Sequence, residues 1–291
     1  MLERRAPRGA STGTHRIYIA GIGGFGRETA DAIRTLSHAG GASAPELAGF
    51  LDDAPIGRGG RLPVLGAISA IHGLPNARLL VCVGNPRDYF ARALIVRRLG
   101  LADGRYATVV HPTAEVSETS PVGAGSVLLA GAVVTADVRI GRHVAVMPQA
   151  VVTHDAVIGD FATLASGVRL GGGTRIGTGA YLGAGALIRE GVSIGAWSLV
   201  GMGSVVLDDI GPGEVWVGNP ARKLRDVDVP AELREASSAL ASLRSATVPA
   251  LAADVGNAPP DGMSQGAAHG NSHRISQAVE SAFQALDRVL S

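Results

Sequence analysis

The sequence predicts an α/β half-Rossmann domain at the N-terminus, then a parallel β-helix and a short helical C-terminal extension. Three observations favour this fold class. A glycine loop joins a strand-like run to a helix-like run near the start, and aliphatic residues recur every six positions through the middle of the chain. The composition agrees, because 41 glycines and only 4% aromatic residues suit a tightly turning repeat better than an aromatic-packed core.

With 291 residues, the chain is long enough for two domains with substantial cores. We expect a disordered arm over residues 1–14, a Rossmann-like domain over 15–110, a β-helix over 111–225, and a partly disordered helix–linker–helix extension over 226–291. Within the extension, residues 246–272 have the Ala-, Gly-, Pro- and Ser-rich composition of a linker.

The N-terminal domain begins with a strand over 16–20, the glycine loop over 21–26 and a helix over 27–38. Further strands are predicted over 47–51 and 78–83, and a helix that carries Arg92, Arg97 and Arg98 follows. The order β-α-β-β-α over about ninety residues resembles half of a Rossmann fold.

The ends of these strands carry the candidate binding residues of the domain. The loop is a G-x-G-x-x-G between strand and helix, where glycines let the backbone approach a phosphate and the helix N-terminus favours its charge. The carboxylates of Asp52 and Asp53 could accept hydrogen bonds from a ribose or a base edge. An NAD site is disfavoured because the second half of a Rossmann fold is missing, and a tight turn that binds nothing is the other alternative.

The repeat runs from Val116 to Val206. Every sixth residue is Leu, Ile or Val at all sixteen positions, four residues later a small or β-branched residue follows, and glycine often comes directly after the aliphatic residue. Three short strands per triangular coil would place the large side chains inside, giving five coils that bury their faces only against one another. We expect the small residue to fit the corner and glycine to supply the backbone angles of the turn.

Two of the eight histidines lie inside the repeat. His154 falls two residues after the inward Val152, so its side chain is expected to point away from the core. Histidine titrates near neutral pH and is a common general base, and the neighbouring Asp155 could orient it. His143 carries no such neighbour, and we expect it to be an ordinary surface residue.

The repeat resembles the hexapeptide-repeat acyltransferases, and its combination with the glycine-loop domain resembles one subgroup over residues 15–225. This subgroup is the bacterial sugar O-acyltransferase family, which includes sialic acid O-acetyltransferases and UDP- or dTDP-4-amino-sugar N-acetyltransferases. The motifs that carry the resemblance are the loop over 21–26, Phe50–Asp53, Pro63–Gly66, Val83–Asn85 and His111–Ala114. The resemblance implies a left-handed β-helix and a homotrimer with active sites between subunits.

The resemblance also implies roles for residues. The subgroup's motif of His, Asp or Glu, a small residue, two further positions and Gly is matched by residues 154–159, which makes His154 the general base and Asp155 its orienter. Acetyl-CoA would be the co-substrate, with no metal. The sugar nucleotide would lie against Gly21, Gly23, Gly24, Gly26, Asp52, Asp53, Gly84 and Asn85.

Coenzyme A would lie along the β-helix. The Asn that the family places seven residues before the histidine is Met147 here, so another donor such as Gln149 could replace it. The amide of Gly172 would polarise the thioester, and Lys223 could meet a coenzyme phosphate, although a polar cap on the last coil is an equal alternative for its loop. The implied cofactor-binding positions are Met147, Gly172, Ala184, Gly201 and Lys223.

We therefore expect an acetyl-CoA-dependent N-acetyltransferase that acts on a UDP- or dTDP-linked 4-amino sugar. O-acetylation of sialic acid or of another sugar hydroxyl, and a non-catalytic nucleotide-sugar binder, remain alternatives. A γ-class carbonic anhydrase would need three metal-binding histidines, and the repeat supplies two. A sugar-nucleotide pyrophosphorylase would need an N-terminal domain larger than ninety residues.

Bulk properties exclude other partners. The net charge of +1 and 18% charged residues give no global field for nucleic acid or an anionic membrane. The single cysteine, Cys82, cannot form a disulfide within the chain, and no apolar run is long enough for a transmembrane helix or a secretory signal. We expect a cytoplasmic protein.

Overall fold

The computed structural model describes residues 16–39, 45–53 and 63–234. The predicted arm over 1–14 and the part of the predicted extension from residue 235 onward lie outside the described residues. All described residues belong to one compact unit. In the described ranges, no helix is long and apolar enough to cross a membrane.

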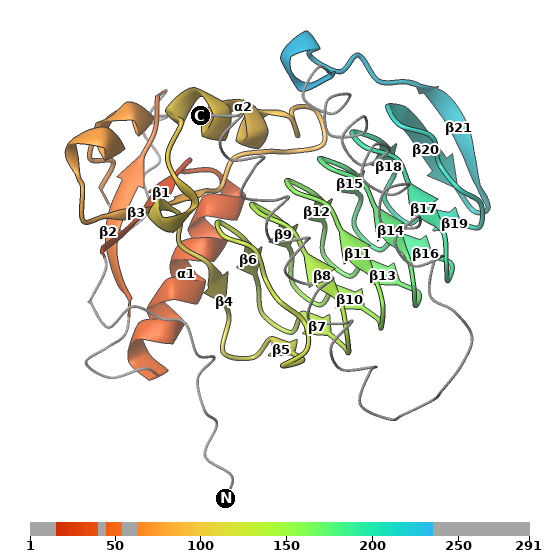
Figure 1. The fold of residues 1–291 in the computed structure, drawn as a ribbon, viewed down its shortest axis with the longest axis horizontal. Coiled ribbons are helices and arrows are strands. Elements are labelled where there is room, and N and C mark those ends of the chain that lie inside the picture. The colour runs from red at the N-terminus through yellow and green to blue at the C-terminus, as the bar shows by residue number, and fades with distance from the viewer. Residues whose placement is uncertain (1–15, 40–44, 54–62, 235–291) are drawn as a thin grey trace, which may run out of the picture. The chain divides into compact units, whose positions relative to one another are not determined.

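The N-terminal elements form a three-stranded parallel sheet in the order β2-β1-β3 (Figure 1). The half-Rossmann prediction is confirmed. The third strand ends two residues earlier than expected, and the first helix starts three residues earlier, inside the glycine loop. The bounds are β1 Arg16–Ala20, α1 Gly24–Ala39, β2 Glu46–Leu51, η2 Ile68–Gly73, β3 Arg78–Val81, α2 Ala91–Leu99 and η3 Asp103–Arg105.

The rest of the described chain is a left-handed parallel β-helix whose coils have three faces. Face 1 contains β4 (Val109–Val110), β6 (Val127–Leu128), β9 (Ala145–Val146), β12 (Thr163–Leu164), β15 (Tyr181–Leu182), β18 (Leu199–Val200), β20 (Glu214–Gly218) and β21 (Ala221–Asp226). Face 2 contains β5 (Glu115–Val116), β7 (Val133–Val134), β10 (Val151–Val152), β13 (Arg169–Leu170), β16 (Leu187–Ile188) and β19 (Val205–Val206). Face 3 contains β8 (Arg139–Ile140), β11 (Val157–Ile158), β14 (Arg175–Ile176) and β17 (Ser193–Ile194).

Up to β19, the strands of each face pair in parallel with the strand 18 residues further on, as Val151 does with Arg169. The last coil is shorter, since Leu199 pairs with Val215. All six strands of face 2 lie within the predicted repeat. The strand outside it is β4 of face 1, in which Val110 pairs with Leu128, so the β-helix begins before residue 111, inside the segment assigned to the N-terminal domain. With β4 at the start and the bridge of Ile210 to Ile194 at the end, the coils number six, one more than predicted. The last strand, β21, turns back antiparallel on β20 and ends the stack at Asp226.

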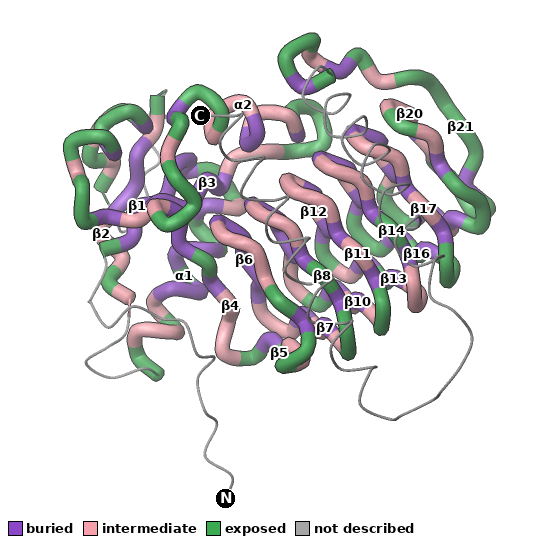
Figure 2. Tube along the Cα trace, in the orientation of Figure 1, coloured by how far each residue is buried: buried purple, intermediate pink, exposed green. Residues whose placement is uncertain are grey.

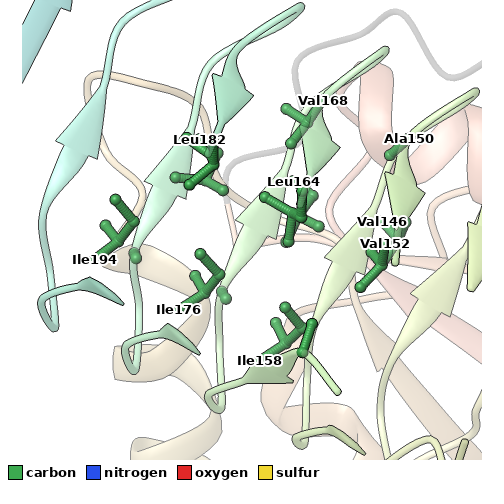
Figure 3. Close-up of a cluster of buried hydrophobic side chains, with 14 of the residues drawn as sticks. Val146, Ala150, Val152, Ile158, Leu164, Val168, Ile176, Leu182 and Ile194 are labelled. Atoms are coloured by element: carbon green, nitrogen blue, oxygen red, sulfur yellow. The ribbon is translucent and has the colours of Figure 1, made fainter. Parts of the chain in front are cut away.

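The repeated aliphatic residues form the core, as predicted. Side chains such as Val152, Leu164 and Leu182 are completely buried and point into the space enclosed by the three faces (Figure 3). The small residues four positions later, such as Ala150 and Ala156, are equally buried. Figure 2 shows the result as buried and more exposed segments that alternate along each coil.

The glycine that follows the aliphatic residue has a different role from the one expected. A Cβ on Gly159 would lie 2.6 Å from Thr178 N of the next coil, so this position is small because successive coils approach closely there. The left-handed backbone conformation falls two residues later, where Asp155 has a φ of 60° and Phe161 a φ of 62°. The turn therefore tolerates non-glycine residues at its strained position.

Face 1 is covered by the N-terminal domain. Its outward residues Val109 and Val127 pack into one apolar cluster with residues of β1, β2 and α1, including Ile19 and Ile33. The residues before and after the β-helix close the other edge: Tyr89 of the segment before α2 donates a hydrogen bond to Trp197 O at 2.8 Å, in a cluster with Val229 and Leu233.

His143 was expected at the surface, and this expectation is wrong. Its side chain is 2% exposed because it lies at the corner between faces 3 and 1, under the N-terminal domain. The ring stacks on Phe161, with ring centroids 5.0 Å apart, and meets Tyr106 edge-on at 4.5 Å. Burial, helped by the charges of Arg92 and Arg142, lowers the pKa of His143 to about 3.

We expect His143 to make the folded protein less stable in mild acid. The unfolded chain takes up a proton as the pH falls through about 6.5, whereas the folded chain resists it down to about pH 3, so stability is lost between these values. His143→Phe keeps an aromatic ring, and Phe161 shows that phenylalanine fits this turn position one coil further on. The wild type should lose about 2 kcal/mol of unfolding free energy between pH 7.5 and pH 5, and His143→Phe should not. Urea unfolding at both pH values measures this, with the exposed His72→Gln as control. Equal pH dependence in wild type and His143→Phe would contradict it.

Candidate active site

The predicted nucleotide-binding residues come together at the carboxyl edge of the parallel sheet. Gly21 follows β1 and donates from its N–H to Leu51 O at 2.9 Å, and Ile22 N donates to Asp52 Oδ2 at 3.0 Å. A Cβ on Gly21 would lie 2.7 Å from Val83 Cγ2, which places the end of β3 beside the same loop. Three chain segments therefore converge at one edge, where open α/β sheets bind ligands.

Two of the four glycines in the loop are required by the fold, and the other two are not. Gly21 has a φ of 101°, and a Cβ on Gly26 would lie 2.0 Å from Gly21 O, so the fold itself requires both. A Cβ on Gly23 or Gly24 would meet no atom within 4 Å. The fold leaves these two backbone positions open at the N-terminus of α1, where an anionic group can approach the chain.

Three other residues predicted to bind the nucleotide stabilise the fold of the N-terminal domain. Asp53 accepts from Ile68 N at 2.8 Å and pairs with Arg98 at 2.6 Å, and these two contacts lower the pKa of its carboxyl group. Asn85 Oδ1 accepts from Arg87 N at 2.9 Å, and Gly84 has a φ of 134° in the loop before it. Asp53 is thus turned toward η2 and α2, and Asp52 is the carboxylate that contacts the glycine loop.

His154 and Asp155 stand on the corner between faces 2 and 3, on the third coil. Both side chains are about two-thirds exposed, and His154 Nδ1 lies 2.8 Å from Asp155 Oδ2. Because an ionised carboxylate can only accept, this bond places the proton of the neutral imidazole on Nδ1 and leaves the lone pair on Nε2. Nε2 is then free to accept a proton from a bound molecule.

Gly172 lies directly beside the imidazole on the next coil. Gly173 N donates to His154 O at 2.8 Å, which locks the two corners together. A Cβ on Gly172 would lie 2.6 Å from Nε2 and 2.5 Å from Cε1 of His154, so only glycine leaves room for the ring. Among the described residues, none accepts a hydrogen bond from Gly172 N–H. A residue with a free backbone donor therefore lies next to the proton acceptor.

The other predicted coenzyme positions lie on a different corner, between faces 1 and 2. Met147 packs in the apolar cluster that joins the N-terminal domain to face 1, with Phe25 and Leu129. Ala184 is exposed two coils further on, and Gly201 follows on the sixth coil, where a Cβ would lie 2.7 Å from Val217 Cγ1. Within one chain, the width of face 2 separates these residues from His154.

Lys223 of β21 has protein partners. Its Nζ lies 2.8 Å from Glu214 Oε1 and 2.7 Å from Asp226 Oδ1. Glu214 also accepts from Trp216 Nε1 at 2.8 Å, so Lys223 is part of a polar cluster on the terminal hairpin.

Arg92 is a feature of this region that sequence reasoning did not place in the site. It is 3% exposed, and its guanidinium reaches residues about seventy positions away, at the corner between faces 3 and 1. No local pattern marks such a residue, since its partners are brought to it only by the fold.

No group of three or more His, Cys, Asp or Glu side chains in the described ranges is arranged to hold a metal ion. The arrangement offers a proton acceptor, a free backbone donor and, on the N-terminal sheet edge, an open glycine loop. Such a set can serve proton abstraction and stabilisation of a developing oxyanion.

Comparisons with known proteins agree with this chemistry. Residues 137–172 match the family model described as bacterial transferase hexapeptide (six repeats). A search of curated proteins finds no match. The acetyltransferase domain of PglB from Neisseria gonorrhoeae is 31% identical, with a TM-score of 0.64, and the match covers 72% of this chain and 100% of that domain.

Two further solved structures are similar over comparable lengths. PerB from Caulobacter crescentus, solved in complex with CoA and GDP-perosamine, is 30% identical with a TM-score of 0.64, over 74% of this chain and 100% of its own. WeeI from Acinetobacter baumannii is 28% identical with a TM-score of 0.60, over 72% of this chain and 100% of its own. The PglB domain has also been solved in complex with acetyl coenzyme A.

We expect Gly172→Ala to displace the His154 ring without unfolding the protein. The added methyl group would overlap Nε2 and Cε1, and the exposed imidazole can swing outward and leave Asp155. Nitrogen-15 NMR of the imidazole should show loss of the Nδ1–H tautomer with an unchanged melting temperature. Gly104→Ala, where a Cβ meets no atom within 4 Å, is the control. A wild-type imidazole spectrum in Gly172→Ala would contradict the expectation.

Proposed function

Because this chain belongs to the hexapeptide-repeat sugar acyltransferases, which are acyl-CoA-dependent enzymes, we propose that it transfers the acetyl group of acetyl-CoA to the amine of a nucleotide-linked amino sugar. The observation that carries the proposal is the His154–Asp155 pair with the free N–H of Gly172 beside it. The N-acetyltransferase solved with GDP-perosamine and CoA supports an amine acceptor on a nucleotide sugar.

The chemistry requires a base, an oxyanion donor and a fixed acceptor. His154 Nε2 removes the proton of the amine as its nitrogen attacks the thioester carbonyl, and Asp155 stabilises the imidazolium that forms. Gly172 N–H donates to the carbonyl oxygen as its negative charge develops. When the C–S bond breaks, the imidazolium returns the proton to the thiolate, so the products are an amide and free coenzyme A.

The faces of the β-helix argue for a site made by two chains. The N-terminal domain covers face 1, and the corner that carries His154 lies between faces 2 and 3, opposite face 1 in a triangular coil. A nucleotide sugar on the glycine loop would therefore need the His154 corner of a neighbouring chain. Four of the six outward side chains of face 2 are apolar, namely Val133, Val151, Leu187 and Val205; Arg169 lies among them, and Glu115 is at the end of the row. We propose that face 2 packs against the neighbour in a homotrimer.

Replacement of the base should abolish turnover. His154→Ala is expected to lower kcat at least 100-fold, because a positioned general base contributes about 10² or more. Asp155→Asn can still accept from Nδ1 and fits the left-handed backbone, so it removes the charge alone and should cause a smaller loss. Thiol release with acetyl-CoA is measured against UDP-, dTDP- and GDP-linked amino sugars and free sialic acid. Asp137→Asn, the same change at the same corner one coil earlier, is the control.

The outcomes separate the possible activities. Wild-type turnover by a folded His154→Ala protein would contradict the proposed base. Thiol release with sialic acid but with no amino sugar would replace the proposed amine acceptor by a hydroxyl. Thiol release with no acceptor in the panel, together with nucleotide-sugar binding, would favour a binding protein.

Mixed trimers test the two-chain site. Gly23→Asp places a carboxylate at the N-cap of α1. The added Cβ meets no atom within 4 Å, and the charge suits the helix but repels a diphosphate. We expect it to be as inactive as His154→Ala, while Gly23→Ser keeps activity. Co-expression of the two inactive chains should restore about one quarter of the sites, because each site takes His154 from one chain and the loop from its neighbour.

The mixed protein must be trimeric by light scattering for this comparison. If one chain supplied both parts, every site in the mixture would carry a defect, and no activity would return. Absence of activity from a mixed trimer would therefore contradict the two-chain site, whatever the identity of the sugar.

A further inference from the structure

A positively charged side chain is buried at the junction of the N-terminal domain and the β-helix. Arg92 of α2 is 3% exposed, and among the described residues no carboxylate acts on its pKa. Burial lowers the pKa of Arg92 to about 10, so the guanidinium still carries its charge at neutral pH. A buried charge without a counter-ion is costly, which calls for a reason to keep it.

The Nη2 end of the guanidinium forms hydrogen bonds with the β-helix. Nη2 donates to Phe161 O at 2.8 Å, to Ala162 O at 3.3 Å and to Thr163 Oγ1 at 2.7 Å. These acceptors lie where the corner between faces 3 and 1 runs into β12. Arg92 is thus tied to the β-helix by three neutral acceptors, none of which compensates its charge.

The other end faces the loop that follows β3. Nη1 lies 3.5 Å from Val83 O, and a Cβ on Gly84 would lie 3.7 Å from Nη1. Val83 in turn lies against Gly21, because a Cβ on Gly21 would be 2.7 Å from Val83 Cγ2. Nε has no hydrogen-bond partner. The uncompensated charge therefore lies behind the sheet edge at which the glycine loop and the N-terminus of α1 meet.

We propose that Arg92 is the positioning residue for the diphosphate of the acceptor: it fixes the Val83–Asn85 loop to the β-helix and supplies, from behind Gly84, the charge that a bound diphosphate balances. The inference rests on the proposed nucleotide-sugar acceptor. A buried cation acts through a medium of low dielectric, so its field reaches a group bound in front of the loop without direct contact. Gly84, which has no side chain, keeps the layer between cation and ligand thin.

Calorimetric binding to the full-length protein tests this. The probes are UDP, dTDP and GDP, the corresponding nucleosides, and coenzyme A. Arg92→Met removes the charge at similar length, and Arg92→Lys keeps the charge but loses the forked hydrogen bonds. We expect Arg92→Met to lower the affinity for the nucleoside diphosphate roughly tenfold or more, and Arg92→Lys to lower it less. The affinities for the nucleoside and for coenzyme A should stay within about twofold of wild type.

Arg92→Gln supplies a second variant if Arg92→Met does not fold: it keeps an amide donor but removes the charge, so it should lower the ratio of diphosphate to nucleoside affinity as Arg92→Met does. Thr163→Val is the matched control, because it removes one acceptor of Arg92 and keeps the charge, and it should leave that ratio unchanged. A purely structural role predicts that diphosphate, nucleoside and coenzyme A weaken together. That result, or unchanged diphosphate affinity in Arg92→Met, would overturn the proposal.

The proposed function fails in a different way. If the wild-type protein binds none of the three nucleoside diphosphates, the acceptor class is wrong, and the role of Arg92 is overturned with it. If the wild type binds one of them and transfers acetyl groups, and Arg92→Met retains the affinity, only the role of Arg92 is overturned.

Discussion

Backbone hydrogen bonds between successive coils are the constraint on which the rest of the structure depends. Val127 N donates to Val144 O, Ala145 N to Ala162 O, and the pattern continues with a coil of 18 residues. Each coil is held only by its neighbours, so the register of one coil fixes the position of the next. Glycines such as Gly159 keep this spacing, because a methyl group there would push the next coil away.

The constant coil length turns each corner into a ladder of side chains about 4.8 Å apart. On the corner between faces 2 and 3, this puts Gly172 beside the ring of His154. On the corner between faces 3 and 1, the same geometry stacks His143 on Phe161. The two histidines occupy similar turns, His143 at the left-handed position and His154 one position before it. The N-terminal domain covers the corner of His143 and leaves that of His154 exposed.

The placement of the N-terminal domain also decides how the two halves of the candidate site can meet. Because the domain lies on face 1, its glycine loop and the His154 corner of the same chain are on opposite sides of the coil. The apolar outward row on face 2 offers a contact for a neighbouring chain. In this arrangement Arg92 ties the two domains rigidly together, which a site shared between chains requires.

The six-residue repeat of aliphatic residues was enough to predict the β-helix, because a strand and a turn every six residues place all of these side chains inside. The strand-like and helix-like runs around the glycine loop were enough to predict the half-Rossmann topology. The sequence also identified the His154–Asp155 pair, because residues that are adjacent in sequence are close in space whatever the fold. It did not reveal the sixth coil, since β4 is recognised as a coil strand by its pairing with β6, nor the close approach that explains the glycines after the core residues. The folded chain was needed to show that His143 is buried and that Arg92 joins the domains. It was also needed to show that Asp53 binds η2 and α2, whereas Asp52 contacts the glycine loop. These properties depend on contacts between residues tens of positions apart, and no local pattern encodes which face of the β-helix the N-terminal domain covers.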